Sequence, residues 1–154
     1  MKIPREWKEL FDSLCSNRVR FLVVGAHALA VHGRPRATGD LDILVEPTAT
    51  NASRVSAALA DYGFPALARE KESFANPDRM ATLGREPLRV DIMTSISGVS
   101  FASAWRGRVR MNWGGRQINF LGLKEFLKNK RASGRPKDLL DIELINEGVR
   151  RRKR

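Results

Sequence analysis

Asp40 and Asp42 lie one residue apart at the start of an apolar run, Leu41 to Val45, that indicates a strand. Successive side chains of a strand point to opposite faces, so both carboxylates point the same way while Leu41 and Ile43 pack on the other side. Two carboxylates this close repel each other, and burying an isolated one is costly. Their oxygens suit Mg²⁺ or Mn²⁺. The pair therefore predicts a divalent-cation site, unless both groups are solvated at the mouth of the strand.

The residues that precede this pair carry groups suited to phosphate. Gly25 ends an apolar run that indicates a strand, and it opens a short stretch compatible with a helix. Backbone N–H groups at such a turn can hold phosphate, and glycine permits the close approach that a side chain would block. Arg34 and Arg36 supply positive charge in the loop leading to the aspartates, and Thr38 adds a hydroxyl. One short segment thus combines a phosphate cradle with a metal-binding pair.

A third carboxylate, Asp91, lies inside the apolar run RVDIM at residues 89–93. If that run forms a strand beside the one that carries Asp40 and Asp42, three carboxylates converge. A two-metal site for in-line phosphoryl or nucleotidyl transfer requires such a set, because one ion activates the attacking oxygen and the other stabilises the leaving phosphate. A metal-dependent nuclease would use the same aspartates.

The elements that must position these groups follow from the apolar patterns. Apolar residues at positions 7, 10, 11 and 14 share one face of a helix. Helices are expected over residues 4–15, 48–62, 123–132 and 136–147, with short helical stretches over 26–31 and 101–105. Strands are expected over 20–24, 41–45, 88–93, 109–113 and 117–121, and near 80–83 within a segment, 65–87, that otherwise indicates a loop. This irregular alternation predicts a mixed α/β fold, as one domain over residues 1–148 with a basic tail over 149–154.

Positive charge is concentrated in the last third of the chain. The formal net charge is +11, and residues 106–154 contribute +10 of it, with fifteen Lys and Arg against five Asp and Glu. A basic surface attracts polyanions such as nucleic acid or nucleotide phosphates. Arg106, Arg108 and Arg110 would form a basic stripe beside the expected hairpin, with Arg116 on its other arm. RNA binding is therefore expected, unless the charge serves only solubility.

The remaining composition bounds the class of protein. Apolar residues make up 42% of the chain, as in ordinary globular proteins. No run approaches the roughly eighteen apolar residues of a membrane helix, and the first ten residues lack an apolar signal core. The single cysteine, Cys15, cannot form an internal disulfide, which fits a reducing compartment. We therefore expect a cytoplasmic protein without membrane contact.

The ordered segments resemble a known family. Gly25-Ala26, then Asp40-Leu41-Asp42, and later Asp91 in an apolar strand are similar to motifs of the nucleotidyltransferase superfamily with the DNA polymerase beta-like fold. VGAHALAVHGRPRATGDLDILV and LRVDIM resemble above all its minimal members and the abortive-infection-type nucleotidyltransferases of toxin–antitoxin systems. GLKEFLKNKRASGRPKDLLDI resembles their C-terminal motifs, a lysine on one helix and R-x-K-D-x-x-D on the next. The resemblance spans residues 23–145 and implies a mixed sheet flanked by helices, with further helices at the C-terminus.

The resemblance implies roles for individual residues. Asp40, Asp42 and Asp91 would be catalytic and would hold two Mg²⁺ or Mn²⁺ ions. The nucleotide-binding residues would be Gly25, Ala26, Arg36, Thr38, Lys130, Arg135, Lys137 and Asp138. As an alternative, the C-terminal charges could be surface charges of a helix. Asp138 could also orient a basic residue, and Asp141 could pair with Lys137.

Several aromatic and histidine side chains admit two interpretations. Trp105 and Trp113 could stack a base, although packing in the core or the hairpin is more usual. Trp7 is expected in the core. His27 could reach a phosphate at the Gly25 turn, or lie partly exposed on its helix.

The expected function is transfer of NMP from an NTP to a hydroxyl of RNA, such as transfer RNA, or of a protein, with release of pyrophosphate. A toxin–antitoxin system is one context in which a protein of this kind acts. The alternative is a non-catalytic nucleotide- or RNA-binding module, or an antitoxin, that keeps the fold. Gly25-Ala26 supports this alternative, because the family usually has Gly-Gly or Gly-Ser there, whereas the presence of all three carboxylates argues against it.

Overall fold

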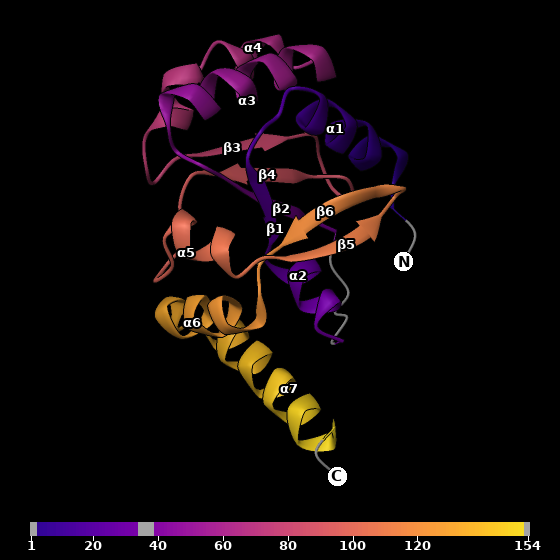
Figure 1. The fold of residues 1–154 in the computed structure, drawn as a ribbon, viewed down its shortest axis with the longest axis vertical. Coiled ribbons are helices and arrows are strands. Elements are labelled where there is room, and N and C mark those ends of the chain that lie inside the picture. Colours follow the sequence, from indigo (N-terminus) through magenta and orange to yellow (C-terminus); the bar gives the residue numbers. More distant parts are fainter. Residues whose placement is uncertain (1–2, 34–38, 153–154) are drawn as a thin grey trace.

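The computed structural model describes residues 3–33 and 39–152 of the chain. Six strands form one mixed sheet in the order β3-β4-β2-β1-β6-β5 (Figure 1). They are β1 (Phe21–Val24), β2 (Leu41–Val45), β3 (Met80–Leu83), β4 (Val90–Met93), β5 (Val109–Trp113) and β6 (Arg116–Phe120). The pairs β1–β6 and β2–β4 are parallel, and the pairs β1–β2, β3–β4 and β5–β6 are antiparallel. The expected mixed α/β class is confirmed.

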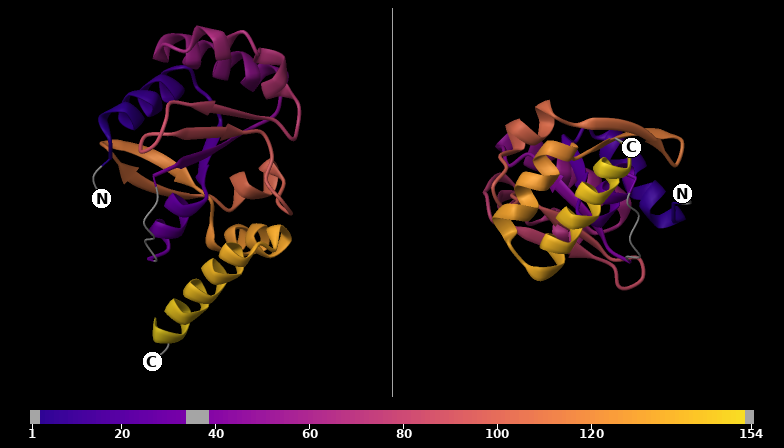
Figure 2. Two further views of the ribbon diagram at one scale, coloured as in Figure 1. Left: turned by 180° about the vertical axis from the view of Figure 1, so that it is seen from behind. Right: turned by 90° about the horizontal axis from the view of Figure 1, so that it is seen from below.

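Helices α1 (Arg5–Ser16) and α3 (Ala49–Tyr62) cover one face of the sheet (Figures 1 and 2). The apolar stripe of α1 is buried as its spacing predicted, and Trp7 lies in the core. The stripe belongs to the same buried cluster as alternate residues of the central strands, including Val23, Leu41 and Ile43. The helix over residues 48–62 is also confirmed: Thr48 caps its N-terminus, and Gly63 ends it in the left-handed conformation.

The opposite face carries α2 (Ala26–Val31), α5 (Phe101–Arg106), α6 (Leu123–Ser133) and α7 (Pro136–Arg152). A second core lies between this face and these helices, and it contains Leu22, Val24, Leu44, Leu29, Ala104, Phe126 and Ile145. The far end of α7 projects away from the sheet (Figures 1 and 2). None of the helices over residues 3–33 and 39–152 has the length and apolar character needed to cross a membrane.

Two parts of the chain differ from the sequence-based expectation. The segment over residues 65–87 contains the expected strand β3 but also a one-turn helix, α4 (Pro65–Ala68), and a 3₁₀ helix, η1 (Lys71–Ala75). These elements are too short to show an apolar period. The last helix was expected to end at Glu147, yet α7 continues through Gly148 to Arg152. Gly148 is buried inside the helix, and Arg151 pairs with Glu147 at 2.7 Å, so most of the expected basic tail is helical.

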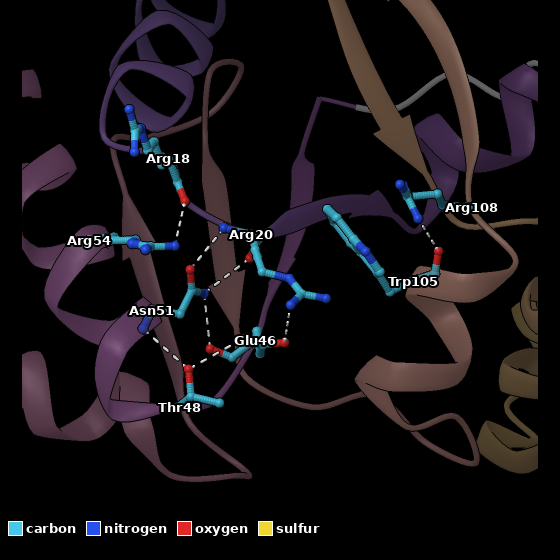
Figure 3. A network of polar contacts seen from close by, with 8 residues as sticks. All are labelled: Arg18, Arg20, Glu46, Thr48, Asn51, Arg54, Trp105 and Arg108. Carbon is cyan, nitrogen blue, oxygen red and sulfur yellow. Dashed lines mark hydrogen bonds and ion pairs between the residues drawn. The ribbon is translucent and has the colours of Figure 1, made fainter.

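A polar network fixes the end of β1 and β2 that lies away from the aspartates (Figure 3). Asn51, in the first turn of α3, accepts a hydrogen bond from the backbone N–H of Arg20 at 2.8 Å. Its amide donates to the carbonyl oxygens of Arg20 and Glu46 at 3.1 and 3.0 Å. The guanidinium of Arg20 lies 4.6 Å from the ring centre of Trp105, and that of Arg108 lies 4.1 Å from it. These contacts hold the register of the two strands that carry the site at their other end.

Candidate functional site

Asp42 and Asp91 lie side by side on neighbouring parallel strands. They are register partners in the β2–β4 pair, and each is the second residue of its strand. Leu41 and Ile43 are fully buried on the opposite face, as the alternation predicted. Burial raises the pKa of Asp42, and the charges of Asp91 and Asp40 raise it further. The strand of Asp91 therefore pairs beside the strand of Asp42, as expected.

Asp40 joins this cluster from the segment just before β2. It lies close enough to Asp42 to raise the pKa of that carboxyl by charge repulsion. Glu86, in the β3–β4 loop, forms a hydrogen bond with Asp40, and this bond is the main reason why the pKa of Glu86 is raised. Asp40 and Glu86 thus lie near the Asp42–Asp91 pair, where β2 and β4 begin.

Gly25 closes the site from the end of β1. Its neighbour Val24 is the register partner of Asp42, which brings the turn against that carboxylate. Gly25 has φ of +69°, and a Cβ built on it would overlap the Oδ2 atom of Asp42. No other residue fits this position without displacing the carboxylate. Ala26 begins α2 directly beside it.

A pocket of about 650 Å³ opens next to these residues. Its volume lies within the range of roughly 300–1,000 Å³ that is usual for small-ligand sites. Gly25 and Asp42 form part of its wall, and α6 and the turn after it supply Asn129, Lys130, Ser133 and Arg135. Asp78 and Arg79 line the side near β3. The pocket therefore lies between Asp42 and the basic C-terminal helices.

Lys130 is held by carboxylates of α7. Its ammonium lies 3.0 Å from Asp138 and 3.5 Å from Asp141, and all three side chains are buried. Arg135 pairs with Asp138 at 2.7 Å. Burial raises the pKa of Asp138, but the hydrogen bonds from Arg135 and Lys130 outweigh it and leave the pKa below its usual value. Asp138 thus orients basic residues, and Asp141 also lies against Lys130.

Lys137 and Arg135 are the exposed cations of this group. Lys137 is close enough to Asp42 to lower the pKa of that carboxyl. The side chain of Arg135 is 60% exposed and lines the pocket. Lys137 is exposed, whereas Arg135 and Lys130 both line the pocket and contact the buried Asp138.

Three residues at the site were not found from the sequence. Thr82 of β3 donates a hydrogen bond to Asp91 Oδ1 at 2.8 Å. Arg89 donates to the same carboxylate from Nε at 3.1 Å and from Nη2 at 3.3 Å. Arg89 could have been noticed, because alternate residues of a strand share a face. Thr82 needs the β3–β4 register, and nothing in the sequence marked Glu86.

The carboxylates are not yet arranged as a complete cation site. Among the described residues, no three His, Cys, Asp or Glu side chains stand close enough together to hold a metal ion. Both oxygens of Asp91 are engaged by Arg89. Arg36 and Thr38, which were expected to bind nucleotide, lie outside the described residues.

Of the two candidates for base stacking, Trp113 belongs to the core, whereas Trp105 is partly buried and lies against the guanidiniums of Arg20 and Arg108. Trp113 is 8% exposed and packs against Phe11 and Phe120, as its more usual role predicted. His27 is also buried, with its ring centre 5.1 Å from that of Trp7, so it neither reaches a phosphate nor lies partly exposed. Burial lowers the pKa of His27, although a hydrogen bond with the Asp40 backbone opposes this.

The expected basic stripe beside the hairpin does not form. Arg106 belongs to α5, and the guanidinium of Arg108 packs over Trp105. Arg116 pairs with Asp12. Only Arg110 is an exposed strand residue among the three that were to form the stripe. An exposed basic face exists instead on α6, where Lys124, Lys128 and Arg131 follow one another at i, i+4 and i+7.

The fold is similar to that of a solved structure. A "putative nucleotidyltransferase" from Thermotoga maritima matches with a TM-score of 0.57 over 98% of this chain and 96% of that chain, at 16% sequence identity. The chain therefore has a nucleotidyltransferase-like fold. No family model and no curated protein matches the sequence.

Proposed function

We propose that the chain is a metal-dependent nucleotidyltransferase that transfers NMP from an NTP to a hydroxyl group. The observation that carries this proposal is the register of Asp42 beside Asp91, facing the Gly25 turn at the wall of a nucleotide-sized pocket. The similarity of the whole fold to a "putative nucleotidyltransferase" supports it.

The donor set suits hard divalent cations. Carboxylate oxygens of Asp40, Asp42 and Asp91 would hold two Mg²⁺ or Mn²⁺ ions. Burial raises the pKa of Asp42, and the charges of Asp91 and Asp40 raise it further, so a cation bound there would offset an unfavourable charge. Once bound, the ions would neutralise the developing phosphate charge and lower the pKa of the attacking hydroxyl. The register of β2 and β4 holds Asp42 and Asp91 side by side.

The residues around the pocket suit a triphosphate. Gly25 permits close approach of the phosphates, and Arg135 and Lys137 supply exposed positive charge. In the reaction, the acceptor oxygen forms a bond to the α-phosphorus as the bond from that phosphorus to the β-phosphate oxygen breaks. Pyrophosphate leaves, and the proton of the acceptor passes to solvent by way of the Asp91 carboxylate. Lys130 supports this wall of the pocket through Asp138.

The proposed acceptor is RNA. Its support is the net charge of +10 over residues 106–154, together with the exposed face of Lys124, Lys128 and Arg131 on α6, the helix that also lines the pocket. A triphosphate with bound cations needs little of this charge, so a larger polyanion accounts for it better.

Product analysis with labelled substrates tests the proposal. The protein is incubated with Mg²⁺, each α-³²P-labelled NTP in turn, and total transfer RNA. Label should appear on the RNA, and it should be lost with Asp42→Asn but kept with Glu143→Gln, an exposed change on α7. Label on protein instead would identify a protein acceptor, as in toxin–antitoxin nucleotidyltransferases. Shortened RNA would indicate a nuclease, and retained NTP without transfer would favour a binding module.

A further inference from the structure

Arg89 contacts the carboxylate of Asp91, which the proposed cation site needs as a ligand. Its guanidinium contacts both oxygens of Asp91, at 3.1 and 3.3 Å. Oδ1 also accepts the hydrogen bond from Thr82 at 2.8 Å. A cation that binds Asp91 must use electron pairs that now face the guanidinium. Arg89 and the cation therefore compete for one ligand.

The carboxylates around Arg89 explain why a positive charge is favourable at this position. Asp91 lies beside Asp42 in the sheet, and Asp40 and Glu86 act on Arg89 as nearby negative charges. Without a cation, carboxylates packed this closely repel one another and destabilise the fold. A single guanidinium offsets part of that repulsion, since it places one positive charge within the cluster.

Release of Asp91 by Arg89 requires movement of the Arg89 side chain but not of its backbone. Its carbonyl oxygen accepts a hydrogen bond from the backbone N–H of Leu41 at 3.0 Å, which anchors the main chain. The guanidinium end is on a long flexible stem, and the side chain is 38% exposed, against 11% for Asp91. Thr82 can remain on Asp91 when the guanidinium leaves, so the carboxylate keeps one orienting contact.

We propose that Arg89 is a resident counter-ion of the site, which holds Asp91 in the absence of metal and is displaced when a divalent cation binds. This inference rests on the proposed function, because it assumes that Asp91 is a cation ligand. It adds that Arg89 lowers the affinity of the site for a divalent cation, because the cation must displace the guanidinium from Asp91.

Metal affinity measured without any substrate tests this competition. Free Mn²⁺ is followed by electron paramagnetic resonance during titration of the wild-type chain, Arg89→Gln, Arg89→Lys and Arg85→Gln. Arg85 is a matched control, because it is an exposed arginine of the same loop that forms no ion pair within the described part of the chain. Arg89→Gln should bind Mn²⁺ about five- to tenfold more tightly, since it loses both a competing contact and a nearby positive charge. Arg85→Gln should change the affinity less than about twofold, because its charge lies farther away in solvent.

Thermal unfolding gives a second readout that a purely structural role would not produce. In EDTA, Arg89→Gln should unfold at a lower temperature than wild type, because the carboxylates lose their counter-ion. Mn²⁺ should raise its unfolding temperature more than it raises that of wild type. Arg89→Lys, which keeps the charge without the two-pronged contact, should lie between them in both measurements.

Several results would overturn the inference. Equal Mn²⁺ affinity in Arg89→Gln and Arg85→Gln would show that the guanidinium does not compete. Weaker binding in Arg89→Gln than in wild type would show that Arg89 helps to build the site. If the wild type and all variants fail to bind Mn²⁺, the proposed metal site fails together with this inference. If the wild type binds Mn²⁺ and Arg89→Gln binds it with the same affinity, the proposed metal site stands and only the inference about Arg89 fails.

Discussion

The ammonium of Lys130 on α6 lies 3.0 Å from the carboxylate of Asp138 on α7, and both side chains are buried. Asp141 lies 3.5 Å from the same ammonium, one turn farther along α7. One lysine thus faces two carboxylates across a helix–helix contact. This arrangement ties the basic helices together and forms one wall of the pocket beside Gly25.

Lys130→Met should destabilise the fold strongly. The change leaves two buried carboxylates without their shared cation, and breaking a buried pair from one side typically costs about 3–5 kcal/mol. The free energy of unfolding from urea titration measures the loss. Lys128→Met, an exposed lysine of the same helix, is the control and should change stability by less than about 0.5 kcal/mol. Equal effects of the two variants would contradict a clamping role for Lys130.

The stabilising contribution of Asp138 to the fold should decrease as the pH falls into the acid range. Its pKa is lower in the folded chain than usual, so its contribution is fully present above the ordinary carboxyl value and is lost as pH falls through the folded value. The stability difference between wild type and Asp138→Asn should therefore be constant near neutral pH and narrow below about pH 4. Urea unfolding at fixed ionic strength between pH 7 and 2 measures it. A difference that widens on acidification would reverse the assigned sign.

Local sequence patterns were sufficient to predict the strands that carry the candidate site. The bounds of β2 agree with the expected run over residues 41–45, and Asp91 lies in the predicted strand beside it. Alternation within a strand is a short-range property, so it is visible in a single sequence. The same is true of the apolar stripe of α1.

Partner choice among charged residues was not visible in the sequence. Lys130 was expected near phosphate and lines the pocket, but the sequence did not show that the course of α7 also places two carboxylates beside its ammonium. Arg108 was expected to contribute to a basic stripe, but Trp105 lies within reach of its guanidinium. A long cation pairs with whatever the tertiary fold brings near it, and that depends on contacts between distant segments.

Asp42→Asn should stabilise the metal-free protein. Burial, and then repulsion from Asp91 and Asp40, raises the pKa of Asp42, which means that the charged form costs stability above that pKa. Removing the charge at neutral pH in EDTA should raise the free energy of unfolding by about 0.5–2 kcal/mol, as often occurs when a functional residue is removed. The gain should vanish as pH falls and the wild-type carboxyl becomes protonated. Glu143→Gln should show no such gain, and a less stable Asp42→Asn would contradict the assigned repulsion.

Gly25→Ala should damage both stability and the site. Positive φ strains any side chain by about 1–2 kcal/mol, and here the added Cβ also overlaps the Asp42 carboxylate. Gly63→Ala is the control, because Gly63 has φ of +105° but no atom within 4 Å of an added Cβ. Both variants should lose stability in urea titration, and only Gly25→Ala should also weaken Mn²⁺ binding. If the two variants bind Mn²⁺ equally, the Gly25 turn does not shape the site.

The basic face of α6 should govern RNA binding through phosphate contacts. Lys124, Lys128 and Arg131 are exposed on one side of the helix, so a triple change to Gln removes three charges without touching the Lys130 clamp. The slope of log affinity against log salt is about −0.9 per contact on a duplex and about −0.7 on single strands. The triple variant should therefore bind transfer RNA more weakly and lose about two to three slope units.

A matched variant separates local contacts from overall charge. Lys8, Arg69 and Lys71 are exposed on α1 and around η1, which belong to the opposite side of the sheet, and changing all three to Gln removes the same net charge. That variant should keep the wild-type slope, because screened charges act over only about 10 Å at 0.1 M salt. Fluorescence anisotropy with labelled transfer RNA from 50 to about 300 mM salt gives both slopes. Equal losses in the two variants would show that net charge, and not the α6 face, attracts the RNA, and a salt-independent affinity would exclude phosphate contacts altogether.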